Sequence, residues 1–142
     1  MDYFKAIEIS AAGMAAQQAR VEAATLNLAN INTTATRGSP LYQPVTAVIT
    51  SAPTSFTQVL SGSSRPLVIP RATLVPQAGT TPRTVYEPGH PDADSAGMVA
   101  YPGIDHTREM MTVMTALRAY EANLAALQAT KSLAVRALEI GS

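Results

Sequence analysis

Apolar residues recur at alternating spacings of three and four near both ends of the chain. In the N-terminal row, Ile7, Met14, Val21 and Leu28 are seven residues apart. The C-terminal row contains Met110, Val113, Leu117, Tyr120, Leu124, Leu127 and Leu138. Such spacing is typical of helices that pack along a heptad seam. We therefore expect two long helices, each about 40 Å in length at 1.5 Å per residue.

The segment between the two rows has a different composition. All ten prolines lie between Pro40 and Pro102, and six of the eight glycines lie between Gly38 and Gly103. Proline removes a backbone donor and breaks helices, so this segment is expected to contain strands and loops. The predicted fold is mainly α with a β-rich middle. Long coiled-coil helices at residues 1–35 and 104–142 bracket a proline-rich strand and loop region at residues 36–103.

Three stretches of the middle region have the β-branched and apolar composition of short strands. They are residues 42–50, 55–62 and 65–76, the last of which is interrupted by proline and suits a sheet edge. Farther along, apolar residues around Val85 and from Met98 to Tyr101 are separated by turn residues. We expect a hairpin over residues 85–101 with a long loop, in which Tyr86 and Tyr101 form a cross-strand pair.

The faces of the terminal helices outside the apolar rows carry few charges. Between Phe4 and Asn30 only four residues are charged, and most of the others are alanine or apolar. One interpretation is an antiparallel pair within the chain. Such a pair buries only one stripe of each helix, whereas helices that are weakly polar all round indicate more neighbours than one chain supplies. We therefore favour packing between subunits and expect the two ends to become a stable bundle only in an assembly.

Three asparagines, Asn27, Asn30 and Asn32, lie close together at the end of the first helix. Either Asn30 or Asn32 is expected to end the helix in the left-handed conformation. Asn27 and Asn30 are one turn apart, so we expect them to bond to adjoining helices and fix their register. The candidate subunit-interface residues are Ile7, Met14, Val21, Asn27, Leu28, Asn30, Met110, Leu117, Tyr120, Asn123, Leu124, Leu127 and Leu138.

Composition argues against several classes of function. Ten basic and ten acidic residues give a formal net charge of zero, and no basic cluster could follow a nucleic-acid backbone. The chain has no cysteine, which removes disulfides, thiolate catalysis and cysteine metal ligands. Nucleophile elbows and nucleotide-binding loops are absent from the sequence. Its start resembles neither a cleavable signal peptide nor a membrane span. We expect no enzymatic activity, cofactor, nucleic acid, small-molecule substrate or direct membrane insertion.

The residues that most resemble a chemical site are in the sequence HPDAD. His90, Asp92 and Asp94 have the composition of a metal cluster, and the aspartates partly match a calcium loop. The twelfth loop position, which should be a bidentate glutamate, is Gly103. Aspartates beside glycine and proline also bond to their own backbone, so a turn is favoured over a metal-dependent hydrolase, and no metal site is expected. Asp105 is expected to cap the second helix.

Two segments resemble a known family. SAAGMAAQQARVEAATLNLANINTT is similar to the shared start of bacterial flagellar axial proteins. The segment from Tyr86 to Gly141, which contains RAYEAN, closely resembles a proximal rod protein of the flagellar basal body. The resemblance covers about residues 7–32 and 85–141. It implies a structural subunit of the rod, which crosses the periplasm as the drive shaft of the flagellum and transmits torque.

The resemblance also implies partners. The neighbours would be copies of the chain and other flagellar rod proteins in a helical assembly, with the terminal helices as an inner coiled-coil layer. Members of this family are exported through the flagellar type III apparatus without a cleaved signal peptide, so this apparatus is a further expected partner. The alternative is a type III secreted coiled-coil translocator or adaptor that binds a membrane-associated partner.

Overall fold

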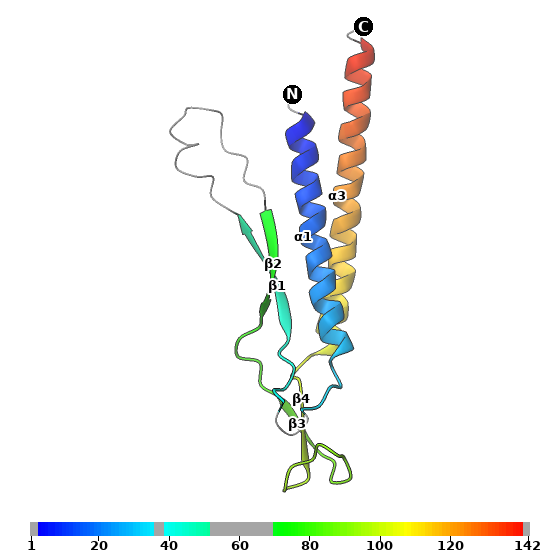
Figure 1. The fold of residues 1–142 in the computed structure, drawn as a ribbon. Helices are drawn as coiled ribbons and strands as arrows, with labels where there is room; N and C mark the ends of the chain where they lie inside the picture. Colours follow the sequence, from blue (N-terminus) through cyan, green and yellow to red (C-terminus); the bar gives the residue numbers. More distant parts are fainter. Residues whose placement is uncertain (1–2, 36–38, 52–69, 141–142) are drawn as a thin grey trace, which may run out of the picture.

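The computed structural model describes residues 3–35, 39–51 and 70–140. In chain order the elements are α1 (Tyr3–Ala29), β1 (Val45–Ser51), β2 (Pro70–Pro76), β3 (Arg83–Tyr86), β4 (Met98–Tyr101) and α3 (His106–Ile140). Two long helices flank a small β-rich region, which confirms this part of the predicted fold (Figure 1). The strand expected at residues 55–62 lies outside the described residues.

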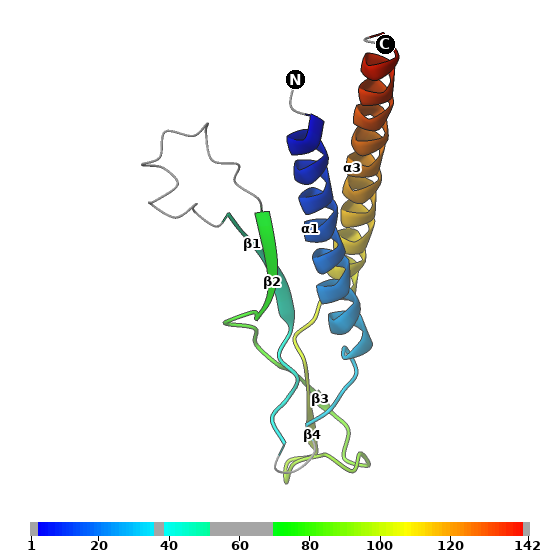
Figure 2. The same ribbon diagram turned by 45° about the horizontal axis from the view of Figure 1, so that its top comes forward.

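The longer elements are arranged with α1 in the middle. The β1–β2 sheet lies along one side of α1, and α3 lies along another (Figures 1 and 2). The short β3–β4 sheet lies beyond the C-terminal end of α1. Among the described elements, α3 packs only against α1. Most of the surface of α3 is therefore left uncovered by its own chain.

The two long helices run antiparallel and pack against each other within one chain (Figure 1). The internal pair, which the charge pattern made the less favoured interpretation, is thus present in the single chain. Helix α1 has 27 residues and α3 has 35, a difference of about 12 Å in length. The last turns of α3 extend past the start of α1.

Small side chains occupy the contact between the two helices. Ala24 of α1 and Ala116 of α3 are both fully buried. Gly13 of α1 lies against Asn123 of α3, and a Cβ added at Gly13 would come within 3.0 Å of the Asn123 amide. The distance between packed helices depends on the side chains at the contact, and small ones allow the axes to approach closely. The helix pair therefore has close backbones and a thin apolar core.

Side chains close the helix ends that lie near the β3–β4 sheet. The Asp105 carboxylate accepts hydrogen bonds from two backbone N–H groups in the first turn of α3, at 2.9 and 3.3 Å, which confirms Asp105 as the cap. At the end of α1, the Asn30 side-chain amide donates to the Leu26 carbonyl at 2.8 Å. Among the described residues only glycines have a positive φ. The left-handed cap expected at Asn30 or Asn32 is therefore wrong, because a side-chain bond satisfies this end instead.

Strands β1 and β2 form an antiparallel sheet in which Val45 is opposite Pro76 and Ser51 is opposite Pro70. Strand β1 begins three residues later than the β-branched composition indicated, because residues 42–44 precede it. Residues 65–69 lie outside the described residues. Proline at each end of β2 fits an edge strand, where a missing N–H costs no ladder bond. Two of the three predicted strands are thus paired with each other.

Strands β3 and β4 form the hairpin predicted within residues 85–101. The register places Tyr86 opposite Met98 and Arg83 opposite Tyr101. The expected cross-strand pair of Tyr86 and Tyr101 is therefore wrong. Strand β3 begins at Arg83, two residues earlier than expected. The register places this arginine, three residues before Tyr86, opposite Tyr101.

Candidate assembly surface

Only part of the apolar row predicted on α3 contacts α1. Ala116 and Asn123 lie at the helix contact, and the predicted row follows one position later at Leu117 and Leu124. One residue step turns a helix by about 100°, so the two rows lie beside each other on α3. The contact within the chain uses the row of small residues together with the half-buried Val113 and Leu127, and it leaves Leu117 and Leu124 outside.

This row of large residues is mostly exposed in the single chain. The exposed fractions are 42% for Met110, 48% for Leu117, 37% for Tyr120, 36% for Leu124 and 76% for Leu138. Leu127 is half-buried. No described helix combines the length and the apolar character that crossing a membrane would need. Long stripes of exposed apolar side chains are typical of interaction surfaces.

The row predicted on α1, which contains Ile7, Met14, Val21 and Leu28, is half-buried. On one side of the helix pair, Arg20 of α1 and Glu109 and Thr112 of α3 line a cavity together with β1. Helical periodicity turns both apolar rows away from those cavity-lining positions. The two rows therefore share the side of the helix pair opposite the β1–β2 sheet. We call them together the apolar face: Ile7, Met14, Val21 and Leu28 of α1 with Met110, Leu117, Tyr120 and Leu124 of α3.

Asn27 bonds to its own chain rather than presenting its amide to a neighbour. It is 1% exposed. Its Oδ1 accepts from the Val45 N–H at 2.8 Å and from the Tyr42 hydroxyl at 3.1 Å, while its Nδ2 donates to the Val45 carbonyl at 2.9 Å. The side chain holds the start of β1 on the last turns of α1. The sequence predicted Asn27 as an interface residue. Its side chain instead makes its hydrogen bonds within the chain, because the start of β1 lies against it.

Tyr42 shares this junction between β1 and the helices. Burial raises the pKa of its hydroxyl, and the negative charge of Glu109 raises the pKa further. Both effects favour the protonated hydroxyl, which donates a hydrogen bond to Asn27 Oδ1. Sequence reasoning gave Tyr42 no role, since its partners come from α1 and α3, far away along the chain.

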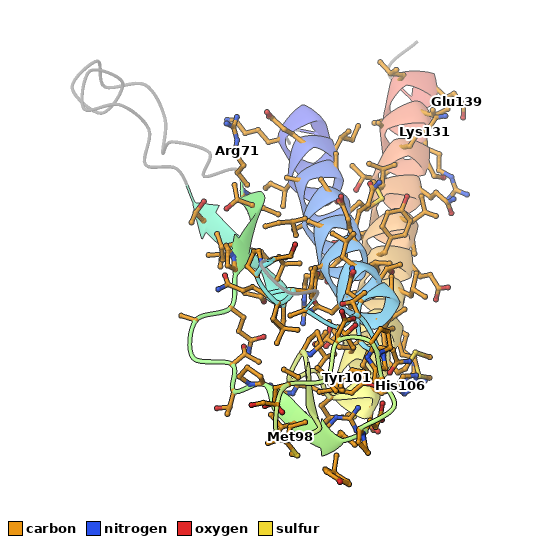
Figure 3. All side chains as sticks on the ribbon, turned by 60° about the horizontal axis from the view of Figure 1, so that its bottom comes forward. Arg71, Met98, Tyr101, His106, Lys131 and Glu139 are labelled. Carbon is orange, nitrogen blue, oxygen red and sulfur yellow. The ribbon has the colours of Figure 1, made fainter. Side chains whose placement is uncertain are left out.

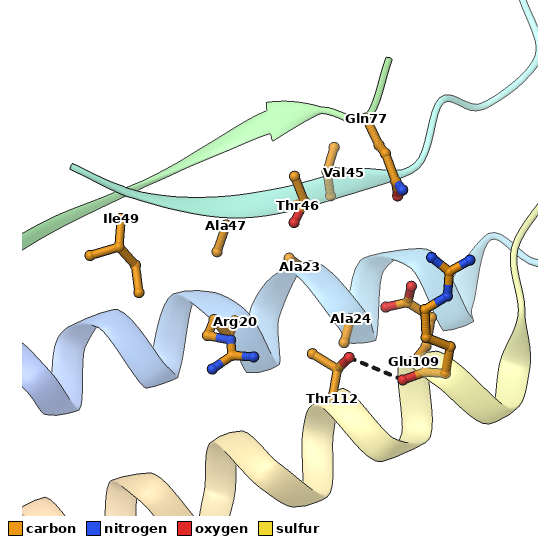
Figure 4. Close-up of a pocket in the computed structure, with 11 residues that line it drawn as sticks. Arg20, Ala23, Ala24, Val45, Thr46, Ala47, Ile49, Gln77, Glu109 and Thr112 are labelled. Carbon is orange, nitrogen blue, oxygen red and sulfur yellow. Dashed lines mark hydrogen bonds between the residues drawn. The ribbon is translucent and has the colours of Figure 1, made fainter. Parts of the chain in front are cut away.

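A cavity of about 370 Å³ lies between β1, α1 and α3 (Figure 4). Ala47 and Ile49 point from β1 toward α1, and Ala23 points from α1 toward β1. Three charged side chains line the cavity, namely Arg20, Arg108 and Glu109. The Arg20 guanidinium donates to the Gln17 side chain at 3.3 Å. The lining is thus partly polar, with one more positive than negative group.

A polar cluster surrounds Tyr101 at the β3–β4 end of the molecule, far from Lys131 and Glu139 on α3 (Figure 3). The Tyr101 hydroxyl donates to the Glu87 carboxylate at 3.0 Å, and the Arg83 guanidinium lies 5.3 Å from the ring centre. The bond to Glu87, then burial and the Glu87 charge, raise the pKa of Tyr101, while Arg83 lowers it. The cluster ties the two strands together.

The HPDAD segment forms a turn, which confirms the favoured interpretation. The Asp94 carboxylate accepts from two backbone N–H groups of the loop, each at 2.8 Å. The Asp92 N–H donates to His90 Nδ1 at 3.1 Å. The Asp92 carboxylate accepts from the Thr34 hydroxyl at 2.6 Å, which joins the loop to the segment after α1. Within residues 3–35, 39–51 and 70–140, no three His, Cys, Asp or Glu side chains converge as a metal site.

Comparison with known proteins adds a family to this geometry. A family model described as "Flagellar basal body rod FlgEFG protein C-terminal" matches residues 95–140, which contain β4 and α3. The chain is 32% identical to the flagellar basal-body rod protein FlgC of Bacillus subtilis (strain 168), with 99% of each chain covered. The chain belongs to the FlgC family. It is 34% identical to FlgC of Aquifex aeolicus (strain VF5), covering 98% of this chain and 97% of the relative. FlgC of Salmonella typhimurium (strain LT2) is 32% identical, with 94% of each chain covered.

Membership of the FlgC family confirms the resemblance seen in the N- and C-terminal segments. The chain is a structural subunit of the rod of the flagellar basal body. The FlgC family is a family of structural proteins, and the relatives do not favour a secreted translocator or adaptor. The matched segment at residues 95–140 includes every member of the apolar face that comes from α3.

Proposed function

We propose that this subunit assembles helically with copies of itself and with other flagellar rod proteins to form the periplasm-spanning drive shaft. Its terminal helices form the inner coiled-coil layer of the rod, and the β-rich middle makes the outer contacts. The chain reaches this place through the flagellar type III export apparatus without a cleaved signal peptide. It transmits torque and has no catalytic role.

The exposed apolar face carries this proposal. The residues at the contact within the chain are small, so the large apolar residues of α3 remain available to a neighbour. Heterologous contacts, in which one surface of a subunit binds a different surface of the next, generate open helical assemblies. Closely packed helices have low compressibility, so a lattice of such contacts passes strain from one subunit to the next.

Replacing Leu117 and Leu124 together with glutamine tests the apolar face. Glutamine is a good helix former and both side chains are exposed, so the single chain should keep its fold. Complete burial of a leucine contributes about 1.5–3 kcal/mol. With 48% and 36% of the two residues exposed, each interface should lose roughly 1–2.5 kcal/mol, or about 5- to 70-fold in association. We expect little of the double variant in purified basal bodies and a loss of motility.

The matched control is Leu133→Gln. Leu133 is 58% exposed, and nine residues from Leu124 place it on the opposite side of α3. This control should enter the rod as the parent chain does. Normal incorporation of the double variant would show that assembly does not need the apolar face. Absence of the parent chain from basal bodies would overturn the proposed function itself.

A further inference from the structure

The outer edge of β1 has backbone groups that the sheet does not use. The Gln77 N–H donates to the Pro44 carbonyl at 2.7 Å, on the far side of the Val45 and Pro76 pair. In an antiparallel ladder this pattern identifies Val45 and Pro76 as a non-hydrogen-bonded pair. The N–H and C=O groups of Val45 therefore point away from β2. Ala47 and Ile49, which follow at intervals of two, have the same orientation.

Asn27 already imitates an added strand at the first of these three positions. Its amide accepts from the Val45 N–H and donates to the Val45 carbonyl, as the backbone of a neighbouring strand would. The outward backbone groups of Ala47 and Ile49 have no such partner within the described part of the chain. Among the described residues, the free edge thus starts after Val45 and continues without a partner at Ala47 and Ile49.

The two edges of the sheet differ in how they are protected. On the outer edge of β2, Pro70 and Pro76 have no N–H to offer, and Arg71 adds a charge to the strand. Strand β1 has the sequence VTAVITS, without proline or charge. Natural proteins block exposed edges with proline and charged residues. The edge of β2 has these features and the edge of β1 does not.

The free edge of β1 borders the cavity of about 370 Å³ between β1, α1 and α3. Figure 4 shows Ala47 and Ile49 on the strand side of this space and Ala23 and Thr112 on the helix side. Peptides that add to a sheet edge gain affinity from main-chain hydrogen bonds and specificity from neighbouring pockets. Arg20 and Arg108 outnumber Glu109 among the charged lining residues, which favours a segment that carries a carboxylate.

We propose that an extended segment of a neighbouring rod subunit adds to the outer edge of β1 as a further strand. The inference rests on the proposed function, since it takes the neighbour from the rod. The added segment bonds to the backbone of Ala47 and Ile49, starts where Asn27 ends, and places an acidic side chain near Arg20 and Arg108. This contact joins the β-rich region of one subunit to the next independently of the apolar face.

Proline substitution at Ile49 tests the strand addition. The Ile49 N–H points away from β2, so Ile49→Pro removes a donor from the free edge and keeps the ladder within the sheet. Ile49→Ala keeps this donor and controls for the lost side chain. Ala72 lies directly opposite Ile49 on β2, and Ala72→Pro removes the equivalent donor from the other edge. We expect at least tenfold less Ile49→Pro than parent protein in purified basal bodies, with Ile49→Ala and Ala72→Pro at parental levels.

Hydrogen exchange of the unsubstituted chain provides a second test that needs no proline. The amides of Ala47 and Ile49 should exchange rapidly in the free chain and slowly in isolated basal bodies. Normal incorporation of Ile49→Pro, or unchanged exchange at both amides in the rod, would overturn the added strand. Absence of the parent chain from basal bodies would instead overturn the proposed function, so the two failures are distinguishable.

Discussion

Replacing Asn27 with alanine should detach the β1–β2 sheet from α1 without separating the two long helices. Asn27 is almost completely buried and makes three hydrogen bonds, two to the backbone of Val45 and one to the Tyr42 hydroxyl. Alanine makes none of these bonds and favours the helical conformation. The loss is therefore confined to the attachment of the sheet, because no residue at the contact with α3 is changed.

The bonds of Asn27 set the size of the effect. One net hydrogen bond contributes about 0.5–1.5 kcal/mol to stability, so three contribute about 1.5–4.5 kcal/mol. Val45 is half-buried and lines the cavity, so water can bond to part of the Val45 backbone once the Asn27 amide is removed. Alanine has a higher helix propensity than asparagine, which offsets about 0.5 kcal/mol of this loss in stability. We expect a net loss of about 2–3 kcal/mol in the attachment of the sheet.

Residue-resolved hydrogen exchange measures this loss directly. A loss of about 2–3 kcal/mol should speed amide exchange in β1 and β2 by about 30- to 150-fold. Exchange in α3 should stay within a few-fold of the parent chain. Asn32→Ala is the control, since Asn32 is exposed and its side chain forms no hydrogen bond within the described residues. Equal exchange of β1 in the two variants would refute the role of Asn27, and so would equal loosening of α3 and the sheet in Asn27→Ala.

Two further predictions concern stability of the free chain. Gly103→Ala should destabilise the chain by about 2 kcal/mol or more, because its Cβ would collide with the Thr81 carbonyl oxygen. Gly89→Ala, where no atom lies within 4 Å of the added Cβ, should change urea unfolding by less than about 0.5 kcal/mol; similar values for both would contradict this. At high pH, the raised pKa of Tyr42 gives a stabilisation that is complete below the unfolded value of about 10 and is lost as pH rises through the folded value. Urea unfolding between pH 8 and 11 should therefore show a steeper loss for the parent chain than for Tyr42→Phe, and equal slopes would rule out this contribution.

The long helices and the second hairpin could be predicted because their signals are local. An apolar row that extends over many turns and a proline-rich interruption determine both ends of α3 and the start of α1 to within two residues, whereas α1 ends six residues before the expected boundary. Turn residues between Tyr86 and Met98 likewise identify the β3–β4 hairpin. Asp94 and Asp105 were assigned correctly for the same reason, since each bonds to backbone only a few residues away.

The remaining features depend on residues that are distant along the chain. Heptad reasoning selects large residues for a helix contact, whereas Gly13 and Asn123 meet because small side chains let two backbones approach. The three asparagines look equivalent in the sequence, and only the position of Val45 distinguishes Asn27 from Asn30. A difference of three residues in the register of β3 against β4 was enough to misassign the partner of Tyr101.

The arrangement of small and large residues on α3 explains how one chain can both pair its helices and retain a surface for assembly. Had Leu117 and Leu124 occupied the contact row, the pair would bury its large side chains and leave little apolar surface to drive association. Placing Ala116 and Asn123 there keeps the chain's own contact thin, and the neighbouring row stays exposed. The same separation applies to β1, where Asn27 occupies one outward position and leaves two. Helix α3 and strand β1 thus each satisfy part of their contacts within the chain and leave Leu117, Leu124, Ala47 and Ile49 outside those contacts.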